Sequence, residues 1–388
     1  MITGAVICEF NPFHNGHKYL LDYMRNDGCD CVICVMSTSF TQRGDVAVFS
    51  KFQRAEDALK GGADIIIELP VVWAVSSAQR FANAGCEIIK ALGSVDRVYF
   101  ASECGDIELL KSAADATMNE GVKATLKKYM QEGDYYPTAL QKAVEEHFCE
   151  DVAHTLSYPN NTLGIEYIKS LKDTDIDIRT IKRAGAQHDC DETWDIFASG
   201  SKLRDDILSE KSTEAFTPGS NAKCENPAFY EYGERAIIYA LRRMSAEDFE
   251  KLPDVSEGLH NRIYDAVRSE NNIDSILEKI KTKRYTHARL RRILTCAVLG
   301  ITKEHQNSSV PYIRVLGFNK SGEIMLKEIH RTASLPLVIN VAGNVNSLSN
   351  DAAAILETEI KATDIRTSFE KAPSPCGQDF TKGIIKIQ

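Results

Sequence analysis

The sequence lacks the features of membrane-spanning and secreted proteins. None of its apolar runs approaches the roughly 18 residues that a membrane-spanning helix needs. An apolar strand pattern begins within a few residues of Met1, which leaves no room for a signal peptide. The 11 cysteines are an odd number and are scattered along the chain, which is typical of proteins kept in a reducing compartment. We therefore predict a cytoplasmic protein that does not associate with a membrane.

Metal-ligand patterns are also scarce. Cys29, Cys31 and Cys34 approach the spacing of zinc ligands, but Cys31 and Cys34 fall within a predicted strand, where successive side chains point to opposite faces. No second Cys-x-x-Cys pair and no His-x-x-x-His pair is present to complete a zinc site. No nearby histidine and acid form an obvious relay that would activate a cysteine. The sequence therefore predicts neither a metal site nor cysteine chemistry.

Positive charge is in the minority. The chain has 46 Lys and Arg against 55 Asp and Glu, and its net charge of −9 argues against a protein that is basic over its whole surface. Basic residues gathered on one face remain compatible with this charge. The hydrophobic content of 43% and the charged content of 26% are ordinary for a globular protein. A chain of 388 residues is long for one domain, and its character changes after Ser212, which predicts two regions, residues 1–212 and 213–388.

The first region alternates between apolar strands and helices. This repetition predicts an α/β fold with a parallel, doubly wound sheet and right-handed crossovers. Ligands of such sheets bind beyond the carboxyl ends of the strands, so we expect the functional residues just after each strand. The predicted strands are Ala5–Glu9, Cys31–Met36, Asp64–Leu69, Asp96–Ala101 and Asp177–Ile181. The predicted helices include Lys18–Arg25, Lys51–Lys60, Ser76–Leu92, Leu109–Met118 and Ala139–Phe148.

The turn after the first strand carries the most informative pattern. It reads Asn11-Pro12-Phe13-His14-Asn15-Gly16-His17, with the two histidines three residues apart at the expected start of a helix. At that spacing both imidazoles face the same way. The free N–H groups and the positive dipole end of a helix N-terminus also suit a phosphate. An ordinary capping turn is the alternative interpretation, and the pairing of the histidines beside Gly16 favours a phosphate site.

Five further polar segments are expected at or near the same edge of the sheet. They are Ser37–Asp45, Ser102–Asp106, Ser157–Tyr167, Lys182–His188 and Ala198–Arg204. The last of these combines two hydroxyls and a glycine at a helix start with an arginine one turn further on, which predicts a second anion site before the short helix Asp205–Leu208. Ordinary connections, a helix N-cap and solvated cations are the alternatives for the other segments.

The second region is predicted to begin with helices. A linker at Thr217–Asn221 precedes a helical stretch from about Pro227 to Gly300. Within it, Lys279–Arg292 holds seven Lys and Arg residues and no acid, with Tyr285 and His287 interleaved. This local reversal of charge is expected of a contact with an RNA backbone, and a solvated helix face is the alternative.

The end of the chain alternates again. Residues from Val310 to about Phe369 show a strand-helix-strand-helix pattern, with strands at Tyr312–Phe318 and Leu335–Val341. This pattern predicts a small α/β unit appended to the helical region.

Two of these patterns together resemble those of a known superfamily. His14-Asn15-Gly16-His17 resembles the H-x-G-H signature of the nucleotidyltransferases, and Ser199-Gly200-Ser201-Lys202-Leu203-Arg204 resembles their second signature, a Ser/Thr-rich turn that ends in arginine. The string around the first signature and several later segments resemble the tRNA(Met) cytidine acetate ligase family over nearly the whole chain. Ala101 stands where that family usually has a glycine.

The resemblance implies an ATP-dependent, RNA-modifying ligase. Acetate would attack the α-phosphate of ATP to form acetyl-adenylate, and the acetyl group would pass to N4 of the wobble cytidine of elongator tRNA(Met). His14 and His17 would be the catalytic residues, and Mg²⁺ is expected as a charge partner without a recognisable ligand set. The implied ATP-binding residues are Ile7, Cys8, Glu9, Phe10, Asn11, Pro12, Phe13, Asn15, Gly16, Lys18, Tyr19, Leu20, Ala101, Ser102, Asn160, Asn161, Arg183, Ser199, Ser201 and Arg204. The predicted tRNA-binding residues are Lys283, Arg284, Arg289, Arg291 and Arg292.

Two other functions are compatible with parts of the sequence. The two signatures alone would also suit a small-molecule adenylyltransferase, but a metabolite needs neither the basic stretch nor a large second region. A nucleotide-gated, non-enzymatic tRNA-binding protein would need the basic stretch, but binding ATP would not require the paired histidines. The ligase is the function that uses the two signatures, the basic stretch and the large second region.

Overall fold

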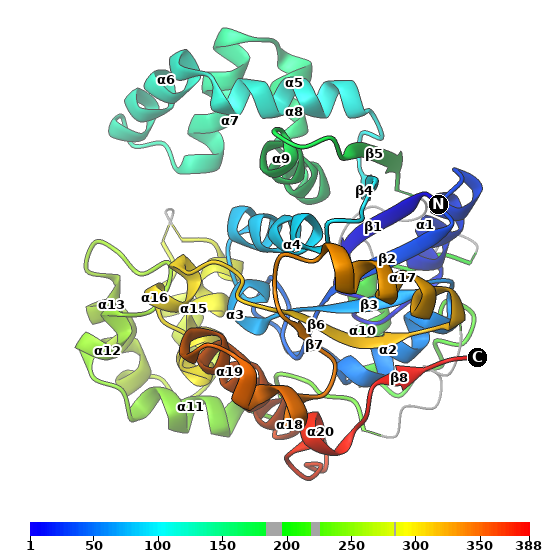
Figure 1. Cartoon of the computed structure of the whole chain (residues 1–388). Helices are drawn as coiled ribbons and strands as arrows, with labels where there is room; N and C mark the ends of the chain where they lie inside the picture. Colours follow the sequence, from blue (N-terminus) through cyan, green and yellow to red (C-terminus); the bar gives the residue numbers. More distant parts are fainter. Residues whose placement is uncertain (184–195, 219–225, 283–284) are drawn as a thin grey trace.

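A computed structural model describes residues 1–183, 196–218, 226–282 and 285–388 (Figure 1). Its centre is an eight-stranded sheet with the order β5-β4-β1-β2-β3-β6-β7, and β8 also pairs with β6. The strands are β1 (Thr3–Cys8), β2 (Cys31–Ser37), β3 (Ile65–Leu69), β4 (Arg97–Ser102), β5 (Asp177–Lys182), β6 (Ile313–Phe318), β7 (Leu337–Val338) and β8 (Ile385–Lys386). The helices are α1 (Asn15–Asn26), α2 (Lys51–Lys60), α3 (Val71–Ala74), α4 (Ala78–Leu92), α5 (Ile107–Met118), α6 (Glu120–Gln131), α7 (Tyr136–His147), α8 (Glu150–Thr155), α9 (Pro159–Leu171), α10 (Gly200–Leu208), α11 (Glu234–Arg242), α12 (Ala246–Glu250), α13 (Leu259–Ser269), α14 (Ile273–Ile280), α15 (His287–Leu299), α16 (Lys303–Asn307), α17 (Lys320–Thr332), α18 (Val341–Asn344), α19 (Asn350–Thr367) and α20 (Gln378–Thr381).

The predicted parallel, doubly wound arrangement is confirmed for β1 to β5. These strands pair in parallel, and every strand predicted in the first region coincides with an observed one to within two residues at each end. Helix α1 begins at Asn15, earlier than the predicted start at Lys18, because His14 already caps it. Boundaries of this kind depend on capping contacts that periodicity alone does not reveal.

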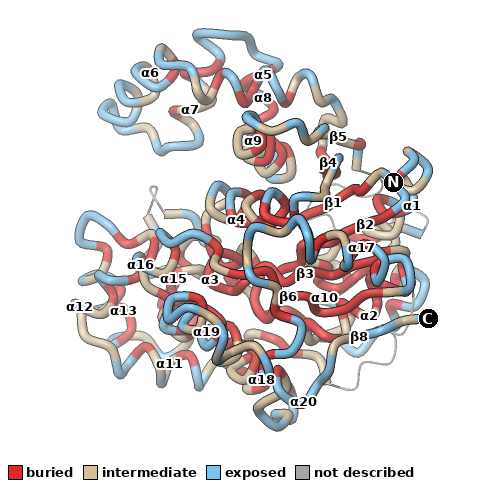
Figure 2. The backbone as a smooth tube through the Cα atoms, in the orientation of Figure 1, coloured by how far each residue is buried: buried red, intermediate tan, exposed pale blue. Residues whose placement is uncertain are grey.

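The central strands are buried on both faces, which explains why most of their residues are apolar. Ala5 and Ile7 of β1 belong to the large hydrophobic cluster that includes residues of α4. Val6 and Cys8 belong to the cluster on the opposite face, which includes residues of α1 and α2. Successive side chains of a strand point to opposite faces, so each central strand contributes to both clusters. Figure 2 shows the buried residues concentrated along these strands.

The strands predicted for a small α/β unit appended at the C-terminus are part of the main sheet instead. Strand β6 pairs antiparallel with β3, with Ile65 opposite Phe318, and therefore extends the main sheet. Every residue of β6 is buried, and the strand covers an edge of β3 that would otherwise expose unpaired backbone groups. The predicted strand Leu335–Val341 shrinks to β7, which pairs with the first part of β6. The division of the chain into the regions 1–212 and 213–388 stays a prediction.

A buried ionic cluster ties the C-terminal helices to the sheet. The Lys51 ammonium lies 3.1 Å from Glu68, 3.0 Å from Glu359 and 2.8 Å from Asp379. Arg314 of β6 lies 3.0 Å from Glu68 and 2.6 Å from Asp379. Removing one partner from such a cluster leaves a buried charge uncompensated, which is strongly destabilising. The cluster therefore fixes α19 and α20 against α2, β3 and β6.

Two groups of helices lie outside the central sheet. Helices α5 to α8 form a group that packs mainly against α9, while α11 to α16 form a second group next to α3 and α19 (Figure 1). The predicted helical stretch from Pro227 to Gly300 corresponds to α11 through α15. Among the described residues, none of the helices combines the length and apolar content needed to cross a membrane.

Candidate active site

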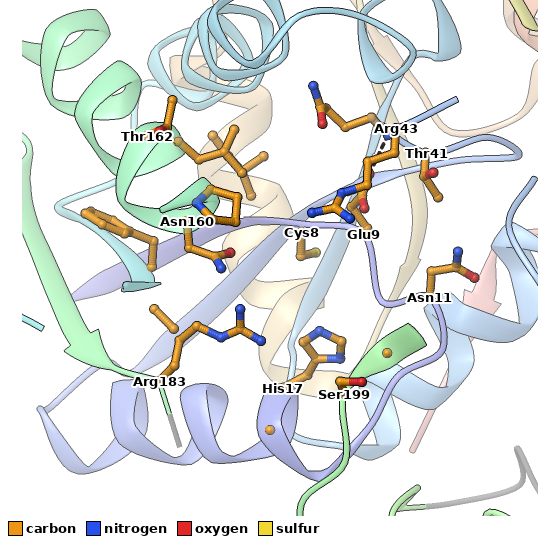
Figure 3. Close-up of a pocket in the computed structure, with 18 of the residues that line it drawn as sticks. Cys8, Glu9, Asn11, His17, Thr41, Arg43, Asn160, Thr162, Arg183 and Ser199 are labelled. Carbon is orange, nitrogen blue, oxygen red and sulfur yellow. Dashed lines mark hydrogen bonds between the residues drawn. The ribbon is translucent and has the colours of Figure 1, made fainter. Parts of the chain in front are cut away.

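A cavity of about 750 Å³ lies at the carboxyl ends of β1, β4 and β5. Strands β2 and β4 lie on opposite sides of β1, so this is the point where the strand order reverses and where doubly wound sheets bind their ligands. Figure 3 shows His17 and Ser199 on one side of this space and Asn160 and Thr162 on the other. The predicted residues that line it are Ile7, Cys8, Glu9, Phe10, Asn11, His14, Gly16, His17, Tyr19, Leu20, Ala101, Asn160, Arg183, Ser199, Ser201 and Arg204.

The two histidines form a reciprocal cap at the start of α1. His14 is the N-cap residue, and its Nδ1 accepts a hydrogen bond from the Gly16 N–H at 3.1 Å. His17 is the third residue of the helix, and its Nδ1 accepts from the His14 N–H at 3.3 Å. Because Nδ1 is an acceptor in both rings, each neutral imidazole carries its proton on Nε2. The capping and phosphate interpretations are therefore compatible, since the cap leaves both Nε2–H groups as donors.

Both imidazoles are neutral at physiological pH. Burial, together with the nearby Arg183 and Arg204 guanidinium groups, lowers the pKa of His14 to about 3. Burial, the neighbouring His14 and Arg183 hold the pKa of His17 well below its usual range. The two rings are stacked with their centroids 3.7 Å apart, which two imidazolium ions would disfavour. The pair is therefore suited to donating hydrogen bonds to an anionic oxygen without carrying charge itself.

Arginines supply the positive charge of the cavity. Arg43, Arg183 and Arg204 all contribute to its lining. Arg204 donates through Nη1 to the Asn11 carbonyl at 2.9 Å and through Nη2 to Ser201 Oγ at 3.1 Å, so its guanidinium is held in one orientation. Planar guanidinium groups around neutral donors form a site that can bind the oxygens of a polyanion such as a phosphate chain.

The second predicted anion site is also a helix N-terminus. Helix α10 begins at Gly200, earlier than the predicted Asp205, and Ser199 is its N-cap, accepting from the Lys202 N–H at 3.1 Å. Gly200 lies close to the Asn11 carbonyl, which an added Cβ would approach to 3.4 Å. The start of α10 therefore packs directly against the turn after β1, and the two signatures lie on the same side of the cavity (Figure 3).

Arg54 fixes the backbone beneath the cavity. Its fully buried guanidinium donates to the carbonyls of Glu9 at 2.5 Å, Ser37 at 2.9 Å and Phe49 at 3.0 Å, and also to that of Thr38. Three of these carbonyls lie at the ends of β1 and β2. Burial lowers the pKa of Arg54 to about 9 and raises the pKa of the Glu9 carboxyl. One side chain thus holds together the two strand ends from which the cavity is built.

The two asparagines at the start of α9 have different roles. Asn161 is buried, and its Oδ1 accepts from the Glu103 and Cys104 N–H groups at 2.9 and 3.2 Å. Asn160 lines the cavity and donates through Nδ2 to the Glu103 carboxylate at 2.6 Å. Arg183 approaches the same carboxylate at 3.8 Å. The geometry therefore makes Asn160 the candidate ligand contact and Asn161 a residue that shapes the loop after β4.

The remaining predicted ATP-binding residues are Pro12, Phe13, Asn15, Lys18, Ser102 and Asn161, which do not line the cavity. Phe13 packs in the core against Phe10, with ring centroids 5.0 Å apart. Lys18 pairs with Asp22 at 2.7 Å, and the Ser102 hydroxyl lies 2.7 Å from that of Thr180. These side chains shape the walls, and the sequence alone does not distinguish such residues from those that face the cavity.

Several lining residues were not predicted as ATP contacts. The loop after β2 was expected at this edge as a polar segment, and its Thr41, Gln42, Arg43 and Asp45 all line the cavity. Thr286, the N-cap of α15, brings the second region of the chain to the site. No local motif marks Thr286, because only the packing of α15 against the first region places it there.

The predicted tRNA-binding residues that the structure describes, Arg289, Arg291 and Arg292, contact other groups of the protein. Lys283 and Arg284 lie outside the described residues. Arg291 pairs with Asp45 at 2.6 Å, and Arg292 pairs with Asp254 at 3.5 Å. Arg289 donates to the Asp254 carbonyl at 2.6 Å. That this stretch contacts tRNA stays a prediction.

A doubly wound sheet, paired histidines at the first helix start and a second anion site define a nucleotidyltransferase. The family model HIGH Nucleotidyl Transferase matches residues 1–379. A tRNA(Met) cytidine acetate ligase of Thermoanaerobacter sp. (strain X514) is 38% identical over 99% of each chain, and one of Acetivibrio thermocellus is 34% identical over 98% of this chain and 99% of its own. Crystal structures of Thermotoga maritima TmcAL, one apo and one bound with alpha-thio ATP, match with TM-scores of 0.93 and 0.90 at 30% identity over all of both chains. The chain belongs to the tRNA(Met) cytidine acetate ligase family.

Proposed function

We propose that the protein is an ATP-dependent ligase that joins acetate to N4 of the wobble cytidine of elongator tRNA(Met). The observation that carries the proposal is the pair of neutral Nε2–H donors, His14 and His17, opposite the cationic Arg183 in a cavity large enough for a nucleotide. The relatives named as tRNA(Met) cytidine acetate ligases and the structure of TmcAL bound with alpha-thio ATP support it.

In the first step, a carboxylate oxygen of acetate attacks the α-phosphorus of ATP. The bond from the α-phosphorus to the bridging oxygen breaks, which leaves acetyl-adenylate and pyrophosphate. His14 and His17 donate to the oxygens of the α-phosphate, where charge builds up in the transition state. Ser199, Ser201 and Arg204 hold the leaving pyrophosphate at the start of α10. Fixed donors need no reorganisation during the step, so positioning and charge stabilisation account for the catalysis.

In the second step, the N4 amine of cytidine attacks the acetyl carbonyl carbon. AMP leaves, the amine loses a proton, and an amide bond has formed. The Thr286 end of α15 lies at the cavity and connects it to the second region, which we propose to bind the tRNA. The described cysteines are free thiols, which agrees with a reducing, cytoplasmic location.

The residues of the cavity do not fit a protein-held Mg²⁺ site. Among the described residues, no cluster of three His, Cys, Asp or Glu side chains could hold a metal ion. Of the carboxylates that line the cavity, Glu9 accepts from the Gln42 N–H at 2.7 Å and Asp45 pairs with Arg291. A Mg²⁺ that accompanies ATP would therefore be held by phosphate oxygens and water, and neither step above is routed through it.

The proposal is tested by pyrophosphate exchange in the absence of tRNA. With ATP and acetate, the protein should incorporate labelled pyrophosphate into ATP, because adenylate formation is reversible. The exchange should require acetate. Exchange that occurs only with acetyl-coenzyme A, or release of ADP and phosphate in place of AMP and pyrophosphate, would contradict the adenylate mechanism.

A further inference from the structure

The loop Thr41–Asp45 brings an arginine into the cavity through a closed turn. Its ends are joined by the hydrogen bond from the Thr41 N–H to the Asp45 carbonyl at 2.9 Å, and the Gly44 N–H donates to the Thr41 carbonyl at 2.9 Å. Gly44 has a φ of +85°, which a residue with a side chain adopts only with strain. Between these bonds lies Arg43, whose guanidinium points toward Glu9 and the open space (Figure 3). The position of Arg43 therefore depends on how the whole loop is held.

Helix α15 holds one side of this loop. Arg291 pairs with Asp45 at 2.6 Å, and the Thr295 hydroxyl, one turn later on the helix, donates to the Gly44 carbonyl at 2.6 Å. The packing is so close that a Cβ at Gly44 would lie 2.7 Å from the backbone nitrogen of Arg292. The helix backbone and two of its side chains thus define where the loop can lie.

The first region holds the other side of the loop. The Gln42 N–H donates to the Glu9 carboxylate at 2.7 Å, and the Gln42 side-chain amide donates to the Ser76 carbonyl at 2.8 Å. Arg43 is therefore flanked by anchors from both regions of the chain. The anchor from α15 includes the ion pair between Arg291 and Asp45. Loss of this ion pair would loosen the Asp45 end of the loop.

We propose that Arg291 is a positioning residue of the ATP site, and that it acts by holding Asp45 and, through it, Arg43. This inference rests on the proposed function, since it takes the ligand of the cavity to be ATP. Arg291 belongs to the basic stretch that the sequence suggests for RNA binding, but its guanidinium is 2.6 Å from an acid within the protein. Its charge serves the nucleotide site and not the phosphates of tRNA.

The test is a double-mutant cycle on ATP affinity, measured by calorimetry with ATP alone. Arg43→Ala should weaken ATP binding about tenfold, because it removes one charge-assisted contact to phosphate. Arg291→Ala should weaken it about three- to tenfold, and Arg291→Lys, which keeps the charge, should recover part of the loss. In the Arg43→Ala background, Arg291→Ala should add little, because the residue it positions is already absent.

The control variant is Arg235→Ala, which removes an exposed cation from α11 and should leave ATP affinity unchanged. Asp45→Asn breaks the same ion pair from the other side and should reproduce Arg291→Ala, so the test survives if one variant folds poorly. Effects of Arg291→Ala and Arg43→Ala that add fully, or an unchanged ATP affinity in Arg291→Ala, would overturn the proposal. Unchanged ATP affinity with a reduced salt slope for tRNA binding would assign Arg291 to the RNA surface instead.

The readout separates this inference from the proposed function. ATP affinity does not depend on which acid is activated or which RNA is modified. If wild-type protein binds ATP but shows no acetate-dependent exchange, the proposed function fails while the cycle still reports on Arg291. If exchange is normal and the cycle is additive, the proposed function stands and the role of Arg291 is wrong.

Discussion

Replacing His17 separates its role in the helix cap from its role in chemistry. His17→Ala removes both the Nδ1 acceptor for the His14 N–H at 3.3 Å and the Nε2–H donor. His17→Gln keeps an acceptor at the third helical position, as in an ordinary capping box. Its NH₂ group, however, is on the same carbon as that acceptor and not across a ring, so it cannot reach the position of Nε2. Loss of one donor to a developing oxyanion lowers a rate by about 10²–10³-fold.

Both variants should therefore lower the rate of acetate-dependent pyrophosphate exchange by about 10²–10³-fold, with a much smaller change in ATP affinity. Only His17→Ala should also lose about 1 kcal/mol of stability, the usual contribution of a helix cap, in denaturant unfolding. If His17→Gln exchanges pyrophosphate at close to the wild-type rate, the histidine is a cap and nothing more. The mechanism would then have to do without it.

Three further outcomes follow from the geometry. Because the pKa of His14 is about 3 and that of His17 is well below its usual range, the exchange rate at saturating substrates should show no histidine titration between pH 6 and 8; an inflection near pH 6.5 would contradict this. Burial and the nearby Glu68 raise the pKa of Glu359 to about 7. The wild-type protein should therefore lose stability relative to Glu359→Gln as the pH rises from 4.5 to 7; parallel stability curves would refute the assignment. Asn160→Ala should weaken ATP binding without changing the melting temperature. Asn161→Ala, which removes a buried acceptor shared by two partly buried N–H groups, should lower the melting temperature by several degrees; the reverse pattern would exchange their roles.

The parallel part of the fold could be predicted from the sequence because its signal is local. Strands β1 to β4 are largely apolar, and helices with a recognisable period or stop signal follow them in the chain. The turn after β1 was also identifiable, because the paired histidines His14 and His17 lie beside Gly16 directly after an apolar strand. What such patterns miss is which strands become neighbours when they are far apart in the chain.

The pairing of β6 with β3 is an example of neighbours that local patterns do not reveal. Residues 313–318 form an apolar strand, and nothing in them indicates that their partner lies some 250 residues earlier at Ile65–Ile67. The ionic cluster is similar, since Lys51, Glu68 and Glu359 are residue types that usually lie at the surface, and here distant segments of the chain bury them together. The error was to treat alternation near the C-terminus as a separate unit.

The site was predictable where a motif carries the contact and unpredictable where tertiary packing does. The family resemblance identified the segment Ser157–Tyr167 but could not tell Asn160, which faces the cavity, from Asn161, which turns inward. Arg291 belongs to a basic stretch that suggests RNA, and only the three-dimensional structure places it against Asp45. A run of basic residues shows only that positive charge is concentrated in one stretch of the sequence. Which group each charge pairs with depends on the fold.

The central claim is tested most directly by nucleoside mass spectrometry on a reconstituted reaction. Purified protein would be incubated with unmodified elongator tRNA(Met), ATP and isotopically labelled acetate, and the tRNA then digested to nucleosides. We expect one labelled N4-acetylcytidine per tRNA at the wobble position, with AMP and pyrophosphate as the other products. Transfer of label to a small molecule in place of tRNA, or binding of tRNA without any acetylation, would contradict the assignment.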